Sequence, residues 1–444
     1  MKILIFILII FLLYGLLFLV IDKLEKKGRA DSELTRKLLH IGSGLIALLF
    51  PLLFKSLTGV VYLGIFFIIL LLILRNMEKF SGGIGKALRK DERQSRGDIY
   101  FIASIVILWV FSYSNRILYY IPLLILIFPD ALAALGGMKF GKIKYKSVVG
   151  EKSVEGSAIF FIVTLVITLG SLLLFTKTGL GLSVIISLLM AFLSMILEAI
   201  SWRGLDNIFV PVLSFFILKS SMESDIFTTG INLLVTIILF LIVIFGKKYA
   251  SLSDDAALTG AFYCYFVWIT GGIKWTAATF FLYVLYRAVT IKPDFDKKEP
   301  YNFATMLIIC LPALFWLIVY RITNIEDIFY VYLTVISSHL SIIGTARMRY
   351  THPEIDFKRV VLINSLIGIS YLTIFMNIFS EGSEKIIWIF CIIAVCLAAF
   401  IFNILQSERK DYTLNKYSLI KHLLTVFICS FIVLIPIWGK YFFK

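Results

Sequence analysis

The chain has 444 residues, of which 60% are hydrophobic and 16% are charged, and its mean hydropathy is +0.95. This composition excludes the series of soluble domains that such a length would usually indicate. The formal net charge of +15 lies mainly between apolar segments, as in membrane proteins, which argues against a nucleic-acid-binding protein.

Apolar segments follow one another along the whole chain, and about 20 apolar residues are enough to span a bilayer as a helix. The segments are continuous rather than alternating, which excludes a transmembrane β-barrel. We therefore predict an all-α, polytopic transmembrane helical bundle of about 15–16 spans. The predicted spans are 2–21, 38–54, 57–74, 98–113, 116–137, 156–176, 180–200, 208–219, 230–246, 256–271, 275–290, 303–321, 326–344, 359–379, 385–404 and 418–437.

The first predicted span has no clear signal-peptide n-region and no A-x-A cleavage site, so we expect it to be retained. Because basic loops stay in the cytoplasm, the distribution of Lys and Arg predicts the topology. We expect both termini outside, in a multi-pass protein of a bacterial plasma membrane, since no organelle address is evident. The basic connections are 22–37, 75–97, 138–155, 291–302 and 405–417.

The first polar cluster, DSELTRKLLHIGSG, spans 31–44. Arg36, His40 and Gly44 recur at every fourth residue, which predicts one shared helix face, and Gly44 permits close approach by a neighbouring helix. Arg36 and Lys37 carry the positive charge that phosphate groups require. Two structural alternatives stay open, because the basic side chains could only anchor the topology and His40 could be a core histidine.

Asp130 follows a long apolar run in FPDALAALGGMKFG (128–141). Pro129 cannot continue the hydrogen bonding of the preceding helix, so we expect the span to break there. Asp130 is then expected to cap a fresh half-helix whose amides face an anion. Small residues follow at four-residue steps, at Ala133, Gly137 and Gly141, and predict a tightly packed seam.

The next connection is basic and ends in KSVEGS (152–157). Lys152 is a candidate phosphate ligand, and Ser153 is a candidate N-cap for the following helix. Gly156 is expected where backbones approach closely, with Ser157 beside it. The structural alternative is that the lysines of this loop only fix the topology.

The stretch LEAISWRGLDNIFVP (197–211) places Glu198 within an apolar span, and Asp206 and Asn207 after a turn glycine. A carboxylate inside a span costs about 2.5–3.5 kcal/mol on insertion scales, so Asp130 and Glu198 are predicted to serve a function. Asp130, Glu198, Asp206 and Asn207 offer the hard oxygen ligands that Mg²⁺ prefers, and Asp130, Asp206 and Asn207 are the candidate metal ligands.

All these clusters, together with the polar stretch 91–101, fall at the predicted cytoplasmic ends of spans. Basic residues suit phosphates, and the carboxylates suit a divalent cation. The sequence therefore predicts a membrane-edge site that holds a nucleotide and its metal, with an oily acceptor in the span interior.

The motifs ELTRKLLHIGSG, DALAALGG followed by KSVEGS, and EAISWRGLDNIFVP resemble, in this order, those of the phytol kinase and dolichol kinase family. That family is related to the integral-membrane CDP-diacylglycerol synthases. The resemblance covers roughly residues 30–220. It implies that Asp130 and Lys152–Ser157 handle nucleotide phosphates and metal, that Asp206 and Asn207 complete the polar site, and that Arg36 and His40 line it.

The second half of the chain has fewer polar residues inside its spans, and we predict two membrane domains, 1–245 and 246–444. SLSDDAALTGAFYCYFVWITGGIKWTAATFFLYVLYR (251–287) resembles the membrane family that includes phytyl-phosphate kinase. The acidic motif of that family is replaced here by SSHLSIIGTARM (337–348), which has no carboxylate. A degenerate second domain is therefore expected.

The resemblance implies a CTP-dependent, Mg²⁺-requiring kinase that phosphorylates the hydroxyl of a long isoprenoid alcohol at the cytoplasmic face. The base for that hydroxyl stays open between Asp130, His40 and Glu198. A lipid-phosphate cytidylyltransferase is the alternative, because the same metal and CTP site could serve attack at the α-phosphorus. A secondary transporter would also explain the many spans, but the polar clusters gather at one face rather than at the bilayer midplane.

Overall fold

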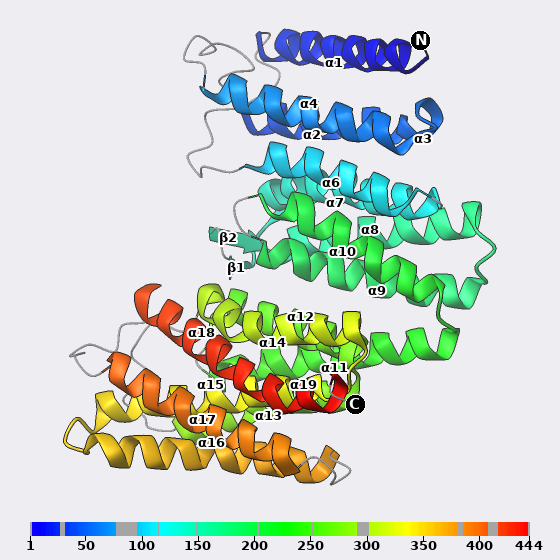
Figure 1. Ribbon diagram of the computed structural model, residues 1–444. Helices are drawn as coiled ribbons and strands as arrows, with labels where there is room; N and C mark the ends of the chain where they lie inside the picture. Colours follow the sequence, from blue (N-terminus) through cyan, green and yellow to red (C-terminus); the bar gives the residue numbers. More distant parts are fainter. Residues whose placement is uncertain are drawn as a thin grey trace. The chain divides into compact units, whose positions relative to one another are not determined.

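The computed structural model describes residues 2–26, 32–76, 96–113, 115–147, 150–201, 204–250, 252–290, 302–379, 385–406 and 416–442. Helices make up almost all of the described chain, and the remaining regular structure is a short β-hairpin (Figure 1). Among the described residues, eleven helices are long and apolar enough to cross a membrane. The prediction of an all-α polytopic helical bundle is confirmed, and the protein is an integral membrane protein.

Every predicted span coincides with helical structure, and the spans 38–54 and 418–437 each consist of consecutive helices. Two of the shorter predicted spans, 208–219 and 256–271, lie on α10 (Asp206–Met222) and α12 (Asp254–Gly271). Neither helix is among the eleven that meet the length and apolarity of a span. Helix α10 is short, with 17 residues, whereas α12 carries polar and small residues where the longer helices carry branched aliphatic ones, and this lowers its hydropathy.

The chain divides into two compact units, Met1–Leu234 and Val235–Lys444. The division falls within α11 (Ile226–Ala250), which contributes residues to both units. The first unit contains α1 (Lys2–Lys26), α2 (Ser32–Leu48), α3 (Phe50–Leu53), α4 (Leu57–Asn76), α6 (Gly97–Phe111), α7 (Ile117–Phe140), α8 (Val154–Phe175), α9 (Leu180–Ile200) and α10.

Helix α7 is the central element of the first unit and packs against α2, α6, α8 and α10. Its residues are apolar on all sides over most of its length, which is typical of a helix buried among others. The side chains of Ile121, Leu123, Ile125 and Ile127 are fully buried. The helix therefore provides a fixed frame for the polar residues near its C-terminal end.

Helix α7 continues without interruption through Pro129, so the predicted break and the predicted half-helix cap at Asp130 were wrong. Proline has no N–H group, which leaves the carbonyl of Ile125 without its helical donor. Neighbouring helices commonly satisfy backbone groups near such a proline inside a membrane. Here the imidazole Nε2 of His40, on α2, lies 2.9 Å from the next carbonyl oxygen, that of Leu126.

A β-hairpin joins α7 to α8 at one end of this helix group (Figure 1). Strand β1 (Lys144–Ser147) pairs antiparallel with β2 (Gly150–Ser153), with Tyr145 opposite Lys152. The side chain of Ser147 donates a hydrogen bond of 2.8 Å to the carbonyl of Ala199 at the end of α9. The hairpin is thus held against α9, and this contact fixes where Lys152 lies.

The second unit is built around α15 (Ile328–Thr351), whose most apolar window is 94% buried. It packs against α13 (Ile273–Thr290), α14 (Phe303–Thr323), α16 (Phe357–Phe379), α17 (Lys385–Gln406) and α18 (Lys416–Ser430). Helix α12 packs on α13 and α14, and α19 (Leu434–Phe442) follows α18 after a short 3-10 turn. Large aromatic side chains fill this core, among them Trp275, Trp316 and Tyr332.

Candidate polar site in the first unit

An ion pair between α2 and α7 forms one side of the candidate site. The ammonium Nζ of Lys37 lies 2.8 Å from Oδ2 of Asp130, and Lys37 is only 5% exposed. Nε2 of His40 lies 3.8 Å from the same carboxylate oxygen. A carboxylate on a membrane-spanning helix requires a partner for its charge, and the buried ammonium group of Lys37 provides it.

The face of α2 that meets α7 differs in part from the predicted one. A Cβ atom added at Gly44 would collide with the side chain of Ile127 on α7, so Gly44 allows the close approach that the sequence predicted. Lys37, rather than Arg36, lies on this face beside His40. Arg36 is exposed, although its charge still acts on Asp130.

Asp206 connects the two halves of the site. It begins α10 directly after a turn in which Gly204 adopts a positive φ of 84°, a conformation that favours glycine. Its charge interacts with those of Asp130, Lys37, His40 and Lys152. Burial and the neighbouring Asp130 raise the pKa of Asp206, so a second positive charge near these two carboxylates would favour their ionised forms.

The other side of the site is an ion pair between β2 and α9. Nζ of Lys152 lies 2.7 Å from Oε1 of Glu198, and it also donates to the Glu198 main-chain carbonyl. Burial alone would lower the pKa of Lys152, but the Glu198 carboxylate outweighs it, so the pKa is raised. On the side of the lysine, the stabilisation from this pair is therefore fully present below the ordinary lysine pKa and is lost as the pH rises through the raised one.

Close backbone contact between α7 and α8 positions the KSVEGS segment. The hydroxyl of Ser153 accepts a hydrogen bond of 3.1 Å from the N–H of Gly156, which caps α8 as predicted. A Cβ atom at Gly141 would lie 2.7 Å from Ser153 Oγ, and one at Gly156 would lie 3.1 Å from the Ala133 carbonyl oxygen. Gly137 faces the same contact, with Ser153 Oγ 3.0 Å from an added Cβ.

The remaining predicted residues have structural contacts at the edge of the site. Nδ2 of Asn207 donates a hydrogen bond of 3.1 Å to the Gly97 carbonyl at the start of α6. The hydroxyl of Ser157 forms a hydrogen bond of 2.8 Å with that of Tyr145 on β1. Tyr145 and Ser147 were not singled out in the sequence, and their only signal there was the polar loop that contains them.

The donor set can be compared with what a divalent cation requires. Among the described residues, no group of three or more His, Cys, Asp and Glu side chains is arranged to hold a metal ion. Mg²⁺, however, keeps several waters and binds through one or two carboxylates together with substrate phosphates. Two mutually repelling carboxylates, Asp130 and Asp206, meet that requirement. One of them, Asp130, already pairs with a positive charge, the ammonium group of Lys37.

One comparison with known proteins agrees with the motifs. The chain is 28% identical to a phytol kinase from Synechocystis sp. over 208 residues, which cover 45% of this chain and 83% of that relative. No protein-family model matches the chain, and no solved structure matches it significantly. The similarity to this relative confirms the resemblance to the phytol kinase family that the sequence motifs predicted.

Proposed function

We propose that this protein is a CTP-dependent, Mg²⁺-requiring kinase that phosphorylates the hydroxyl of a long-chain isoprenoid alcohol. The observation that carries the proposal is the partly buried cluster in which Asp206 interacts electrostatically with both ion pairs, Lys37–Asp130 and Lys152–Glu198. The similarity to a phytol kinase supports the acceptor class. The choice of CTP and Mg²⁺ rests on the motif resemblance and on the donor set.

Phosphoryl transfer requires alignment and charge neutralisation more than covalent chemistry from the protein. Lys37 and Lys152 bind the nucleotide phosphates, while Asp130, Asp206 and Asn207 hold the cation. When bound, Mg²⁺ supplies charge neutralisation at the β- and γ-phosphates. The acceptor oxygen forms a bond to the γ-phosphorus as the bond to the β-phosphate oxygen breaks, which yields the prenyl phosphate and CDP.

The contacts of His40 favour it as the base that takes the acceptor proton. Its Nε2 faces the Leu126 carbonyl oxygen at 2.9 Å, and a carbonyl can only accept, so Nε2 carries the hydrogen. Nδ1 is then left with the lone pair that a base needs. Asp130 and Glu198, in contrast, already accept from ammonium groups.

The site is proposed to face the cytoplasm of a bacterial plasma membrane. The hairpin beside it belongs to the basic connection 138–155, and basic connections remain on the cytoplasmic side. A nucleotide would then reach Lys152 from the compartment in which CTP is made.

The Asp130→Asn variant tests the proposal. We expect phosphate transfer from γ-labelled CTP to prenols to fall by about 100-fold or more, because the neutral amide of asparagine cannot replace the charged carboxylate as a ligand of Mg²⁺. The assay measures labelled prenyl phosphate in membranes that contain equal amounts of each protein.

The matched control is Asp22→Asn, which removes a carboxylate from an exposed pair with Lys26 on α1 and is expected to leave activity unchanged. Unchanged activity in Asp130→Asn would exclude Asp130 from the site. Formation of a CDP-lipid instead of a prenyl phosphate would show that the protein is a cytidylyltransferase rather than a kinase.

A further inference from the structure

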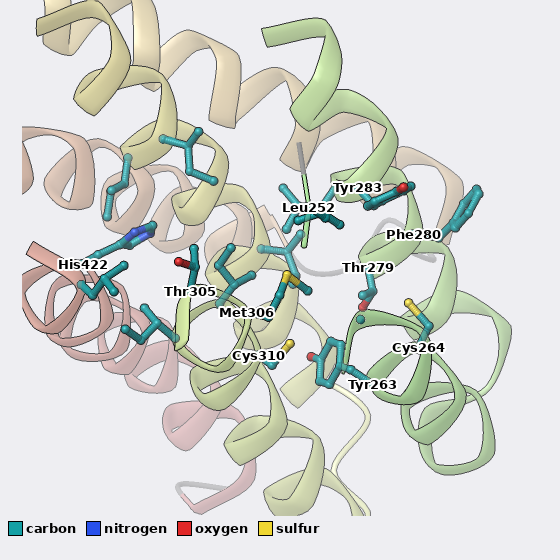
Figure 2. A pocket seen from close by; sticks show the side chains of 18 of the residues that line it. Leu252, Tyr263, Cys264, Thr279, Phe280, Tyr283, Thr305, Met306, Cys310 and His422 are labelled. Carbon is teal, nitrogen blue, oxygen red and sulfur yellow. The ribbon is translucent and has the colours of Figure 1, made fainter. Parts of the chain in front are cut away.

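The second unit contains a partly open cavity of about 130 Å³, lined mainly by residues of α11–α15, α17 and α18. Figure 2 shows His422 at one end, Phe280 and Tyr283 at the other, and Met306 and Cys310 between them. Most of the lining side chains are buried within the unit. A molecule in the cavity is therefore enclosed by protein rather than by the surrounding lipid.

The wall of the cavity is almost wholly apolar. Among the described residues that line it there is no Lys, Arg, Asp or Glu. Four of its polar side chains already form hydrogen bonds within the protein. The pairs are Tyr263–Tyr332, Thr279–Tyr332, Thr305–Asn302 and His422–His339. The hydroxyl of Tyr283 lies against Gly246, which is not part of the lining, so this hydroxyl is turned away from the cavity.

A cavity with such a wall is unsuited to water or to a polar ligand. A buried water molecule needs about two to four polar partners, and most of the polar groups here are already bonded to the protein. An empty cavity is also unfavourable, because the side chains around it lose the van der Waals contacts of a close-packed interior. Hydrocarbon restores these contacts and requires no hydrogen bond.

The length of the cavity indicates the shape of the molecule that fits it. Its lining follows α15 from Ile336 to Ala346, a stretch that rises by about 15 Å in an α-helix. A cavity of about 130 Å³ that extends so far is narrow. A compact molecule such as benzene, which fits an engineered cavity of about 150 Å³, would leave part of this length empty. A single aliphatic chain fills it, and Met306 and Cys310 adapt to an irregular aliphatic surface.

We propose that this cavity binds a single aliphatic chain, which belongs to a membrane phospholipid or to an isoprenoid lipid. The head group of that lipid stays outside, because burial of a charged or polar group without partners is costly. The proposal follows from the second unit alone, and its tests require no kinase activity. Its outcome is therefore independent of the reaction proposed for the first unit.

Photolabelling of the full-length protein in phosphatidylcholine vesicles tests this proposal. The probes are a phosphatidylcholine with a diazirine in one acyl chain, an isoprenoid hydrocarbon with a diazirine, and a diazirine-bearing adamantane as a compact apolar probe. Helix α14 provides an internal comparison, because Met306 and Cys310 line the cavity whereas Phe315 and Ile318 are exposed. We expect at least one chain probe to label Met306 or Cys310, and the adamantane probe to label exposed positions only, as mapped by mass spectrometry.

The pattern of labelling also identifies the source of the chain. Cavity labelling by one chain probe alone supports the proposal for that source, and labelling by both supports it for either source. Labelling by both chain probes that is confined to exposed positions would overturn the proposal. Cavity labelling by the adamantane probe that equals that by the chain probes would overturn the choice of a chain.

Two alanines of the second unit give a matched pair of variants. Both Ala346 and Ala277 are half-buried and pack against the same hydrophobic core, but of the two only Ala346 lines the cavity. Ala346→Leu is expected to lower cavity labelling at least about threefold, because the added atoms occupy the path of the chain. Ala277→Leu is expected to leave it unchanged. Equal cavity labelling in the two variants would contradict the proposal.

Competition in the unaltered protein gives a measurement that does not depend on how a variant folds. An excess of unlabelled hexadecane is expected to reduce labelling of Met306 and Cys310 at least about threefold, because a cavity of this size holds little more than one such ligand. Labelling of the exposed Phe315 is expected to stay the same. A reduction that is equal at all three positions, or absent at all three, would show that the probes only sampled the surrounding lipid and would overturn the proposal.

Discussion

Lys37 and Asp130 place two opposite charges inside the helix group of the first unit, with Lys37 almost fully buried. A buried pair adds little stability compared with apolar residues, but removal of one partner leaves an uncompensated charge. The pair is therefore better explained by a role at the site than by folding. In the proposed reaction, Lys37 is free to move towards phosphate once a cation neutralises Asp130.

Lys37→Met tests the energetic part of this explanation. We expect the free energy of unfolding to fall by about 3–5 kcal/mol, because Asp130 is left buried without its counter-ion. The double variant Lys37→Met with Asp130→Asn is expected to regain most of that stability while remaining inactive. Thermal unfolding in detergent measures both. Equal stability of the single and double variants would contradict a direct interaction.

The sequence could indicate which residue types form the site, but only in part which of these residues interact with each other. Positions 36, 40 and 44 and positions 37, 40 and 44 both fit a helical face, and a single sequence does not show which one meets α7. The structure selects Lys37 because the Gly44–Ile127 contact sets the rotation of α2. Glu198 and Lys152 were both singled out, but their pairing depends on the hairpin contact with α9, which has no sequence signature.

At the scale of elements, the spans were predictable because continuous apolar runs have few structural solutions in a membrane. The prediction that was wrong at this scale was the helix break at Pro129. Proline removes one hydrogen bond, but whether the helix ends there depends on what surrounds it. His40 and the close packing of α2 at Gly44 support α7 at this point, and neither contact is visible in the local sequence.

The seam between α7 and α8 gives a prediction at the same scale. Gly141→Ala is expected to lower stability by about 1–3 kcal/mol, since the added methyl group meets Ser153 and the Gly137 carbonyl. The displaced KSVEGS segment is expected to raise the KM for CTP. Gly170→Ala on α8, which has nothing within 4 Å of the added atom, serves as control. A stable Gly141→Ala variant with an unchanged KM would refute this role of the seam.

For the whole molecule, the division into two units separates the polar cluster from the apolar cavity. Every residue of the cluster lies within Met1–Leu234, and every lining residue of the cavity lies within Val235–Lys444. The change of composition along the sequence indicated two domains. The exact division could not be read from it, because α11 is one continuous apolar helix that serves both units.

A truncated chain that ends after residue 250, and so keeps all of α11, is expected to retain prenol kinase activity. The reason is that the charges that surround Asp206 all come from the first unit. Transfer from labelled CTP in membranes measures it, with the truncated Asp130→Asn chain as control. An inactive truncated chain that still elutes as a monodisperse peak would show that the second unit supplies part of the chemistry.

The burial of α15 has a consequence for biogenesis. This helix carries a row of buried Ser, Thr and His side chains, which are costly in contact with lipid. During translation it leaves the ribosome before α16, α17 and α18 exist, so at first only α12, α13 and α14 can shield it. The second unit therefore completes its packing late, and a stall or cleavage after α15 would expose a polar helix that membrane quality control can recognise.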